Sequence, residues 1–190
     1  MKCLKLNPQT LCFAALMIGI NILGGFLALM LKLPIYLDSI GTILSALILG
    51  PLGGGLVGIL TALVNGLTFD PVSLYFLPVQ LFIGVATGLL FKNGRFEGVK
   101  SILSIILIAV LVSMISSIIV ALIFDGVTSS GSSLIVAVMR NVGINLFASV
   151  FSTQIITDVL DKAIAFAVAF AAIKAIPQIF LERLTHSSFK

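Results

Sequence analysis

Long runs of apolar residues dominate the chain, and polar positions interrupt them only briefly. Four runs reach or approach the length of about 20 residues that a helix needs to cross a bilayer. They span residues 11–31, 73–91, 99–124 and 163–181. The strands of a transmembrane β-barrel would alternate apolar and polar positions over about ten residues, whereas these runs are continuous. The pattern therefore predicts an all-α membrane protein.

A fifth apolar region, residues 36–67, is interrupted in its middle. Residues 50–55 read GPLGGG, and both proline and clustered glycines break helices. Two arms of about 15 residues remain on either side of this break. They form either two short spans or a shallower hairpin. Both alternatives return the chain to the side from which it came.

A sixth region, residues 134–156, is long enough to cross the membrane but carries many polar side chains. They are Arg140, Asn141, Asn145 and Gln154. Such a load is expensive for a helix that faces lipid. It is tolerated where the segment lies against protein and a watery cavity.

The distribution of basic residues decides between the two arrangements. Cytoplasmic segments are enriched in Lys and Arg. Lys2 and Lys5 therefore place the N-terminus in the cytoplasm, as do the basic residues of the loop 92–100 and of the tail. The loop 125–133 has one Asp and no basic residue, which suits the outside. Both termini inside require an even number of spans. We expect six transmembrane helices, with residues 134–156 forming an outer-side helical cap or re-entrant segment before the last helix.

Composition narrows the function classes. The chain is 59% hydrophobic and 9% charged, far from the quarter or so of charged residues in soluble domains. We expect one membrane-embedded domain over residues 1–190. Eleven basic residues without a basic run do not suit a nucleic-acid binder. One His and two Cys leave no basis for a zinc site or a Cys/His catalytic pair, so we expect no enzyme, metal or cofactor. With no Walker loop, a partner must supply any energy.

Two groups of polar residues call for an explanation, because charge in an apolar chain is expensive. Asp158 and Lys162 share a face at the start of the expected last helix, with Asp161 beside them. They form either a surface ion pair or the wall of an outward-facing ligand pocket. Arg140 either contacts a ligand or pairs internally with an Asp such as Asp125 or Asp158. Its neighbours Asn141 and Asn145 share a face and offer amide donors and acceptors.

Other polar residues are expected at the same side of the membrane. In the expected topology, Tyr36, Asp38, Ser39, Asn65, Asp70, Ser73 and Tyr75 all emerge outside. Together with the two groups above, they predict a binding site that opens outward. Two deeper residues, Asn21 and Gln80, either line this pocket or bridge helices.

Pairs of small residues four positions apart allow helices to approach closely. The pairs are Ala15 and Gly19, Gly24 and Ala28, Gly54 and Gly58, and Gly84 and Gly88. They serve either packing within the chain or docking onto a separate membrane subunit.

Two stretches of the chain have a distinctive pattern. Residues 37–66 read LDSIGTILSALILGPLGGGLVGILTALVNG, and residues 78–90 read PVQLFIGVATGLL. Through these stretches, its size and its six apolar segments, the sequence resembles the substrate-binding S components of energy-coupling factor (ECF) transporters, which take up vitamins in bacteria. The resemblance implies a multi-pass protein of the bacterial cytoplasmic membrane. It also implies partnership with a transmembrane coupling subunit and two ATP-binding-cassette ATPases.

The resemblance further implies roles for individual residues. The first helix of such proteins contacts the coupling subunit through an Ala-xxx-Ala motif. Here Ala14 is followed four residues later by Ile18, so Ala15 and Gly19 fit the small-residue pattern instead. In some members an Asp and a Lys near the start of the last helix bind ligand, and Asp158 and Lys162 match them.

The substrate is expected to be a small water-soluble vitamin or precursor. Thiamine binders of the family lean on tryptophan, which this chain lacks. The mixture of acids, amides and cations favours a pyridoxine- or hydroxymethylpyrimidine-type ligand, with pantothenate next. The alternative is a self-sufficient secondary transporter of a small polar solute, although no internal repeat supports it.

Overall fold

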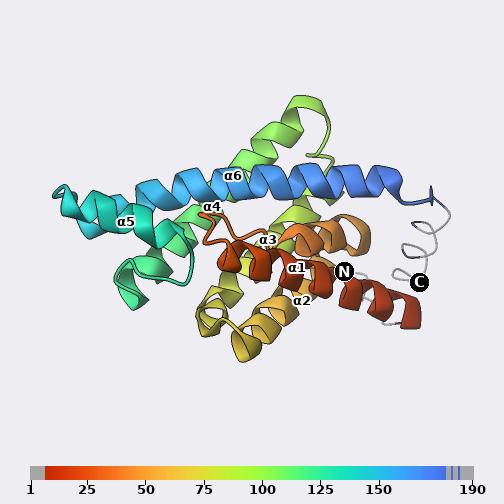
Figure 1. Ribbon diagram of the computed structural model, residues 1–190. Helices are drawn as coiled ribbons and strands as arrows, with labels where there is room; N and C mark the ends of the chain where they lie inside the picture. The colour runs from red at the N-terminus through yellow and green to blue at the C-terminus, as the bar shows by residue number, and fades with distance from the viewer. Residues whose placement is uncertain (1–6, 179–180, 182–183, 185–190) are drawn as a thin grey trace.

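The computed structural model describes residues 7–178, 181 and 184 (Figure 1). Its helices are α1 (Pro8–Met30), α2 (Ile40–Thr68), the 3-10 helix η1 (Pro71–Phe76), α3 (Leu77–Lys92), α4 (Gly98–Ile123), α5 (Ser132–Asn141) and α6 (Leu146–Ala175). The described part of the chain contains no strand, which confirms the all-α prediction. The terminal basic residues that the sequence argument used, Lys2, Lys5, Arg183 and Lys190, lie outside the described residues.

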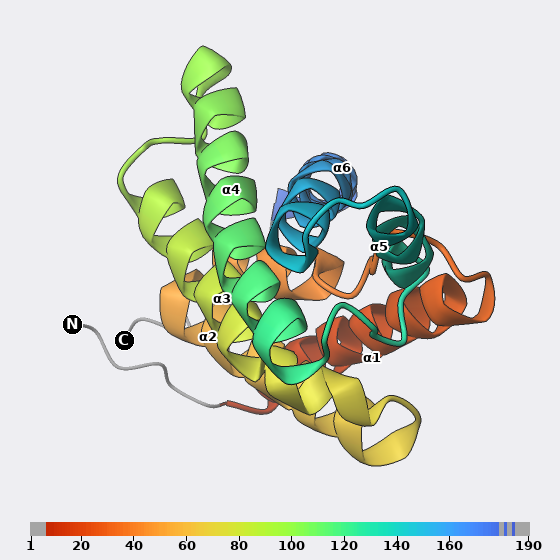
Figure 2. The same cartoon turned by 90° about the vertical axis from the view of Figure 1, so that its left-hand side faces the viewer.

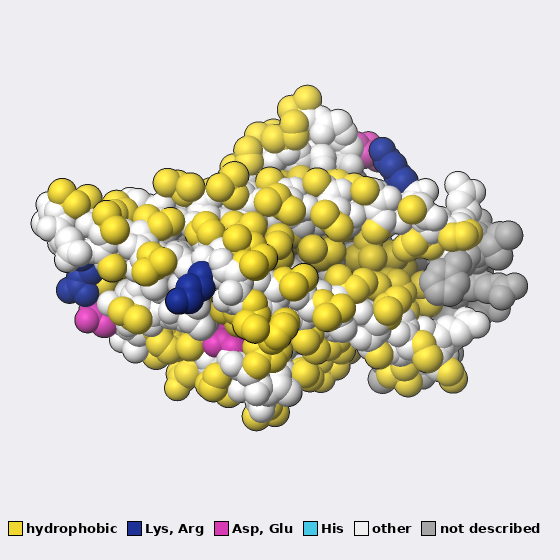
Figure 3. All heavy atoms as spheres, in the orientation of Figure 1, with side chains coloured by type: hydrophobic (Ala, Val, Ile, Leu, Met, Phe, Trp, Pro, Cys, Tyr) yellow, Lys and Arg dark blue, Asp and Glu magenta, His cyan; other side chains and the backbone are white. Residues whose placement is uncertain are grey.

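The molecule exposes apolar side chains and buries polar ones. In the part of the chain that the structure describes, four helical stretches are long and apolar enough to cross a membrane: Pro8–Met30, Ile40–Thr68, Pro71–Lys92 and Gly98–Ile123. Large residues such as Leu16, Leu23 and Leu122 point outward from them, whereas Asn21 and Thr61 are buried. Figure 3 shows hydrophobic side chains over most of one face, with charged side chains confined to small clusters. This arrangement is the reverse of a soluble protein and suits contact with lipid.

The break in the apolar region 36–67 turns α2 into a hairpin. Gly50 has φ 80° and ψ −174°, a conformation outside the helical region that glycine adopts without strain, and Pro51 starts the second arm. The two arms lie side by side, because a Cβ on Gly54 would overlap Ala46. The predicted interruption is therefore confirmed, and its short arms are antiparallel.

Glycines let the neighbouring elements pack tightly on this hairpin. A side chain on Gly84 of α3 would overlap the backbone at Gly54, and one on Gly88 would overlap Pro51. On α1, Gly24 leaves no room for a Cβ against Leu37. Three of the four predicted small-residue pairs thus serve packing within the chain.

The region 134–156 is not one element, so this part of the prediction is wrong. Helix α5 ends at Asn141, and Gly143 with φ 90° turns the chain. Asn145 then caps α6, since its side-chain oxygen accepts a hydrogen bond of 2.8 Å from the backbone N–H of Ala148. Only the beginning of the region forms a short separate helix. The remainder extends the last helix, which begins at Leu146 rather than near residue 163.

One apolar core joins the long helices. It includes Phe13 and Met17 of α1, Ile43 of α2, Ile83 of α3, Ile108 of α4 and Phe166 of α6. Figure 1 shows the start of α1 and the end of α6 at the same end of the molecule. Figure 2 looks along α6 while α4 runs across the view, so these two packed helices cross steeply. The crossing leaves the middle of α6 facing the loop between α1 and α2 and the start of α3.

Candidate functional site

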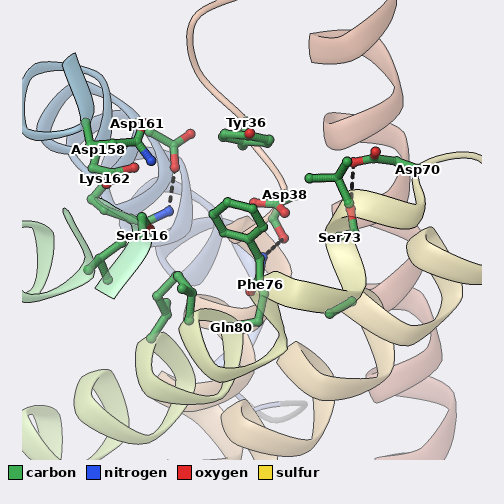
Figure 4. Close-up of a pocket in the computed structure, with 16 residues that line it drawn as sticks. Tyr36, Asp38, Asp70, Ser73, Phe76, Gln80, Ser116, Asp158, Asp161 and Lys162 are labelled. Carbon is green, nitrogen blue, oxygen red and sulfur yellow. Dashed lines mark hydrogen bonds and ion pairs between the residues drawn. The ribbon is translucent and has the colours of Figure 1, made fainter. Parts of the chain in front are cut away.

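A polar pocket lies between the loop joining α1 to α2, the η1–α3 segment, α4 and the middle of α6 (Figure 4). Its polar lining residues are Tyr36, Asp38, Asp70, Ser73, Gln80, Ser116, Gln154, Asp158, Asp161 and Lys162. Its apolar lining residues are Ala62, Val72, Phe76, Val79, Ile83 and Val112. The structure therefore brings together six of the residues that the sequence proposed for ligand binding: Tyr36, Asp38, Asp70, Asp158, Asp161 and Lys162.

Three charged residues of α6 form one wall of the pocket, and we refer to Asp158, Asp161 and Lys162 as the α6 cluster. The sequence placed them at the start of the last helix. They lie in its middle instead, because α6 begins at Leu146. All three side chains are buried. The alternative of a surface ion pair is therefore wrong.

Two neighbouring protein groups hold the amine of Lys162. Its residue is 3% exposed, and its amine forms an ion pair with the carboxylate of Asp161. The amine also donates a hydrogen bond of 3.0 Å to the hydroxyl of Ser39. The pairing partner is thus the adjacent Asp161 rather than Asp158, which the i, i+4 spacing favoured.

The same aspartate fixes the loop over the pocket. The second carboxylate oxygen of Asp161 accepts a hydrogen bond of 2.8 Å from the backbone N–H of Leu37. Leu37 has φ 51°, a left-handed conformation that a leucine adopts only when its surroundings hold it. The close approach of Gly24 to the carbonyl of Leu37 supplies part of that support. The loop is therefore anchored both to α6 and to α1.

Asp158 is the pocket's unsatisfied acceptor. The residue is 6% exposed, and its Oδ2 atom has no hydrogen-bond partner. Burying a carboxylate oxygen without a donor is costly, so such an atom needs a functional explanation. Since Asp158 lines the pocket, a donor on a bound molecule would satisfy it.

The loop contributes two groups whose ionisation is shifted by their surroundings. Burial raises the pKa of the Asp38 carboxyl group from 3.8 to about 6, while the positive charge of Lys162 opposes the rise and the negative charge of Asp161 adds to it. Burial also raises the pKa of the Tyr36 phenol. Tyr36 is therefore a neutral group at pH 7, and its hydroxyl lies 3.5 Å from that of Thr128.

Beneath the pocket, a buried hydrogen-bond network ties α1, α2 and α3 together. The side-chain amide of Gln80 donates to the backbone carbonyl of Asp38 at 3.2 Å and accepts from the hydroxyl of Thr42 at 3.2 Å. The amide nitrogen of Asn21 donates to the hydroxyls of Thr42 and Thr61 at 2.9 and 3.0 Å. Asn21 therefore bridges helices, whereas Gln80 both bridges helices and lines the pocket.

Two aromatic rings narrow the pocket. The rings of Tyr36 and Phe76 lie 6.1 Å apart and tilted by 37°. The cavity has a volume of about 30 Å³, which is room for a few water molecules. A molecule the size of a vitamin must therefore displace side chains or the loop when it enters.

Comparison with known protein families identifies the family to which the chain belongs. The family model for the ECF transporter substrate-specific component matches residues 9–173. The chain belongs to this family. The match extends from the start of α1 almost to the end of α6, so it includes every residue of the pocket. No curated protein and no solved structure matched the chain.

The S component keeps other predicted ligand residues outside the pocket. Arg140 lies 3.6 Å from Asp125 in an ion pair, with both side chains well exposed. Asn141 is exposed at the end of α5, and Asn145 is committed to capping α6. Of the two alternatives for Arg140, the structure thus favours pairing within the protein. The side chains of Arg140, Asn141 and Asn145 do not line the pocket.

Asn65 and Tyr75 also lie away from the lining. The side-chain oxygen of Asn65 is buried without a partner, and its backbone carbonyl accepts hydrogen bonds from Phe69 and Asp70 at the end of α2. Tyr75 is half exposed and packs edge-on against Phe124 at 5.1 Å. Both residues belong to the surroundings of the pocket.

The sequence did not point to the apolar lining residues, such as Phe76, or to Ser116 and Gln154. In the sequence, Phe76 is one of many residues in an apolar run, and Ser116 is one of several serines in another. Gln154 is one of the polar residues that make the region 134–156 unfavourable in contact with lipid. Only Gln154 carried a usable signal, because a buried amide in a membrane helix needs a partner. The other two become pocket residues only through the way that η1 and α4 pack.

Two of the three predicted docking residues, Ala15 and Gly19, lie on the open face of α1. Ala15 is exposed, whereas Ala14 is partly buried and packs against the apolar core. A Cβ on Gly19 would meet nothing within 4 Å. Unlike the other small-residue pairs, Ala15 and Gly19 are not used for packing within the described part of the S component.

Proposed function

We propose that this S component binds a small water-soluble vitamin or vitamin precursor from the outer side of the membrane, in the polar pocket. The observation that carries the proposal is the α6 cluster, whose charged side chains are buried inside a protein with a mostly apolar surface. Charged groups inside a membrane protein are kept where they serve a substrate or a pathway. The pocket binds its substrate without chemical conversion, so the protein is a transport subunit and not an enzyme.

The proposed topology has six transmembrane helices: α1, the two arms of α2, α3, α4 and α6. The first arm of α2 is short, and at 1.5 Å per residue its ten residues extend only about 15 Å. The three charged residues of the α6 cluster face the pocket rather than lipid, and the exposed Lys174 lies in the last turn of α6. Both placements make the helix compatible with a membrane position. Both termini are cytoplasmic in a bacterial cytoplasmic membrane, as the basic residues of the loop 92–100 favour.

The proposed substrate is a pyridoxine- or hydroxymethylpyrimidine-type molecule. The amides of Gln80 and Gln154 and the ring of Phe76 suit a flat, hydrogen-bonding heterocycle. Pantothenate ranks lower, because its carboxylate would meet the carboxylates of the α6 cluster.

Delivery requires partners in this proposal. A transmembrane coupling subunit docks on the open face of α1 at Ala15 and Gly19, next to the partly buried Ala14, and two ATPases supply the energy. Gly19→Leu should therefore weaken association with the coupling subunit while ligand binding stays within twofold. Ala163→Leu, another enlargement at an exposed position, serves as a matched control. Normal association of the Gly19 variant would place the docking surface elsewhere.

The decisive test combines ligand identification with reconstitution. Small molecules extracted from the purified protein are identified by mass spectrometry, and the recovered vitamin is then offered to proteoliposomes. We expect uptake only when the coupling subunit, the ATPases and ATP are all present. Uptake by the S component alone, driven by an ion gradient, would overturn the proposal in favour of a secondary transporter.

A further inference from the structure

We propose that the substrate of the polar pocket is a small planar organic cation, bound through a charged or polarised N–H group that points at Asp158. The inference deepens the proposed function and rests on it. It excludes anionic vitamins, which the residue types alone left open.

The charges of the pocket are unequal. Its described lining contains the four carboxyl groups of Asp38, Asp70, Asp158 and Asp161 against the single amine of Lys162. At neutral pH this lining has an excess of negative charge. In surroundings of low dielectric, such an excess attracts cations and repels anions strongly.

Protein groups already hold two of the three N–H donors of the Lys162 amine. They are the carboxylate of Asp161 and the hydroxyl of Ser39, and both contacts are buried. An anionic ligand at the third donor would lie beside the Asp161 carboxylate and be repelled by it, and one that took the place of that carboxylate would separate Lys162 from Asp161. That separation would leave the Asp161 carboxylate buried without its counter-charge, which is among the most expensive changes inside a protein.

The acids differ in how well they are satisfied. The Asp161 carboxylate receives the amine of Lys162 and the N–H of Leu37, and the Asp70 carboxylate receives the hydroxyl of Ser73 at 2.8 Å. Asp158 alone has a fully buried oxygen, Oδ2, without a partner. The Asp158 carboxylate can therefore accept a hydrogen bond from a ligand, and a cationic donor makes the stronger bond.

The shape of the pocket adds the requirement for a flat molecule. In Figure 4 the ring of Phe76 is drawn between the α6 cluster and Asp38, with Tyr36 above it. Aromatic faces attract cations and stack on flat heterocycles. A planar ring needs the least widening of so narrow a space. A cationic ring in this position has carboxylates on two sides and an aromatic face beside it.

The experiment uses the full chain purified in detergent and a mixed source of vitamins. Yeast extract is separated at pH 7 on ion exchangers into cationic, neutral and anionic fractions, and the thermal stability of the protein is measured with each. We expect the cationic fraction to stabilise the protein most. The greatest stabilisation by the anionic or the neutral fraction would overturn the inference while leaving vitamin binding intact. Stabilisation by none of the fractions would contradict the proposed function itself, and the inference with it.

A matched series of defined probes tests charge at constant shape. Pyridoxamine, pyridoxine and 4-pyridoxate share one ring and differ in the charge of one substituent. In a second series, 1-methylnicotinamide, nicotinamide and nicotinate share a pyridine ring, with the positive charge on the methylated ring nitrogen and the negative charge on the carboxylate. Within each series that binds, the cation should bind at least about tenfold more tightly than the anion. An anion that binds as tightly as its cationic relative would overturn the inference.

Two variants locate the effect at Asp158. Asp158→Asn keeps the shape of the side chain and removes its charge. The same thermal stabilisation should then require about tenfold more of the cationic fraction. Asp125→Asn removes an exposed acid outside the pocket and should change nothing. An unchanged response of the Asp158 variant would overturn the assignment of the cation to this residue. Circular dichroism and elution volume confirm that both variants are folded.

Discussion

Two charged regions of this protein use the same residue types in opposite ways. In the α6 cluster, the side chains of Lys162 and Asp161 are 4% and 2% exposed. In what we call the corner pair, Arg140 and Asp125, the exposed fractions are 45% and 76%. An exposed ion pair contributes about 0–1 kcal/mol to stability, whereas a buried pair cannot lose one partner without leaving an uncompensated charge. Burial, rather than residue type or spacing, therefore separates a candidate binding site from a surface contact.

The largest expected effect comes from removing one member of the buried pair. Lys162→Met leaves the carboxylates of the α6 cluster without a counter-charge. We expect a loss of about 3–5 kcal/mol in the free energy of unfolding, by the usual cost of breaking a buried pair. Arg140→Met, the same change in the corner pair, should cost at most about 1 kcal/mol. Thermal unfolding of the two variants in one detergent measures the difference.

A second variant shows whether charge imbalance is the cause. Replacing Asp161 by Asn in the Lys162→Met background removes the uncompensated carboxylate and should restore part of the lost stability, while the hydrogen bond to Leu37 remains possible. Equal stability of the Lys162 and Arg140 variants would contradict the contrast between the two regions.

The amide network beneath the pocket should show the next largest effect. Asn21→Ala leaves the hydroxyls of Thr42 and Thr61 without their donor, and we expect it to cost about 1–3 kcal/mol. Ligand affinity should fall as well, because Thr42 also holds Gln80. Asn141→Ala, the matched change near the corner pair, should stay within about 0.5 kcal/mol. If the Asn21 variant were as stable as the Asn141 variant, the hydrogen-bond network would not stabilise the fold as proposed.

The pH dependence of ligand binding sharpens the comparison further. Because burial raises the pKa of Asp38 to about 6, this carboxyl group gains a proton as the pH falls through that value. A cation binds the ionised form better, so its affinity should decline as the pH falls through this value, by up to about tenfold per pH unit. Titrations with pyridoxamine at pH 5 and 7.5 measure the change.

Asp38→Asn is the control for the pH effect. It should weaken binding at pH 7.5 and flatten the decline between pH 7 and pH 5, although the other acids of the pocket, Asp70, Asp158 and Asp161, remain. Asp125→Asn in the corner pair should leave the profile unchanged. A steep decline that survives in the Asp38 variant would assign it to a different group.

The smallest effect concerns the polar residues near the corner pair. Asn145→Ala removes the cap of α6 and should lower stability by about 1 kcal/mol, the usual value of such a cap. Ligand affinity should stay within twofold, because Asn145 is absent from the pocket. Reduced affinity without reduced stability would return this region to the binding site.

Several features of the fold could be predicted from local sequence. The apolar runs predicted long lipid-compatible helices, and the GPLGGG stretch predicted the break that Gly50 makes in α2. Both follow from properties of neighbouring residues, namely hydropathy and backbone freedom. The boundary of the last helix was wrong by more than four turns, because the polar residues of 134–156 were counted as a burden on lipid exposure. Gly143 and Asn145, which end one helix and cap the next, mark the true boundary.

The sequence by itself determined that this protein is helical, belongs in a membrane and contains charges that need a reason. It also supplied the resemblance to ECF S components, since that rests on a contiguous motif. Only the tertiary structure decided which charges share a pocket. Lys162 meets Ser39, more than 120 residues away, while Arg140 meets the exposed Asp125, 15 residues away. Spacing along a helix states which residues share a face, but what that face meets depends on how distant helices cross, and burial decides the energy of a charge.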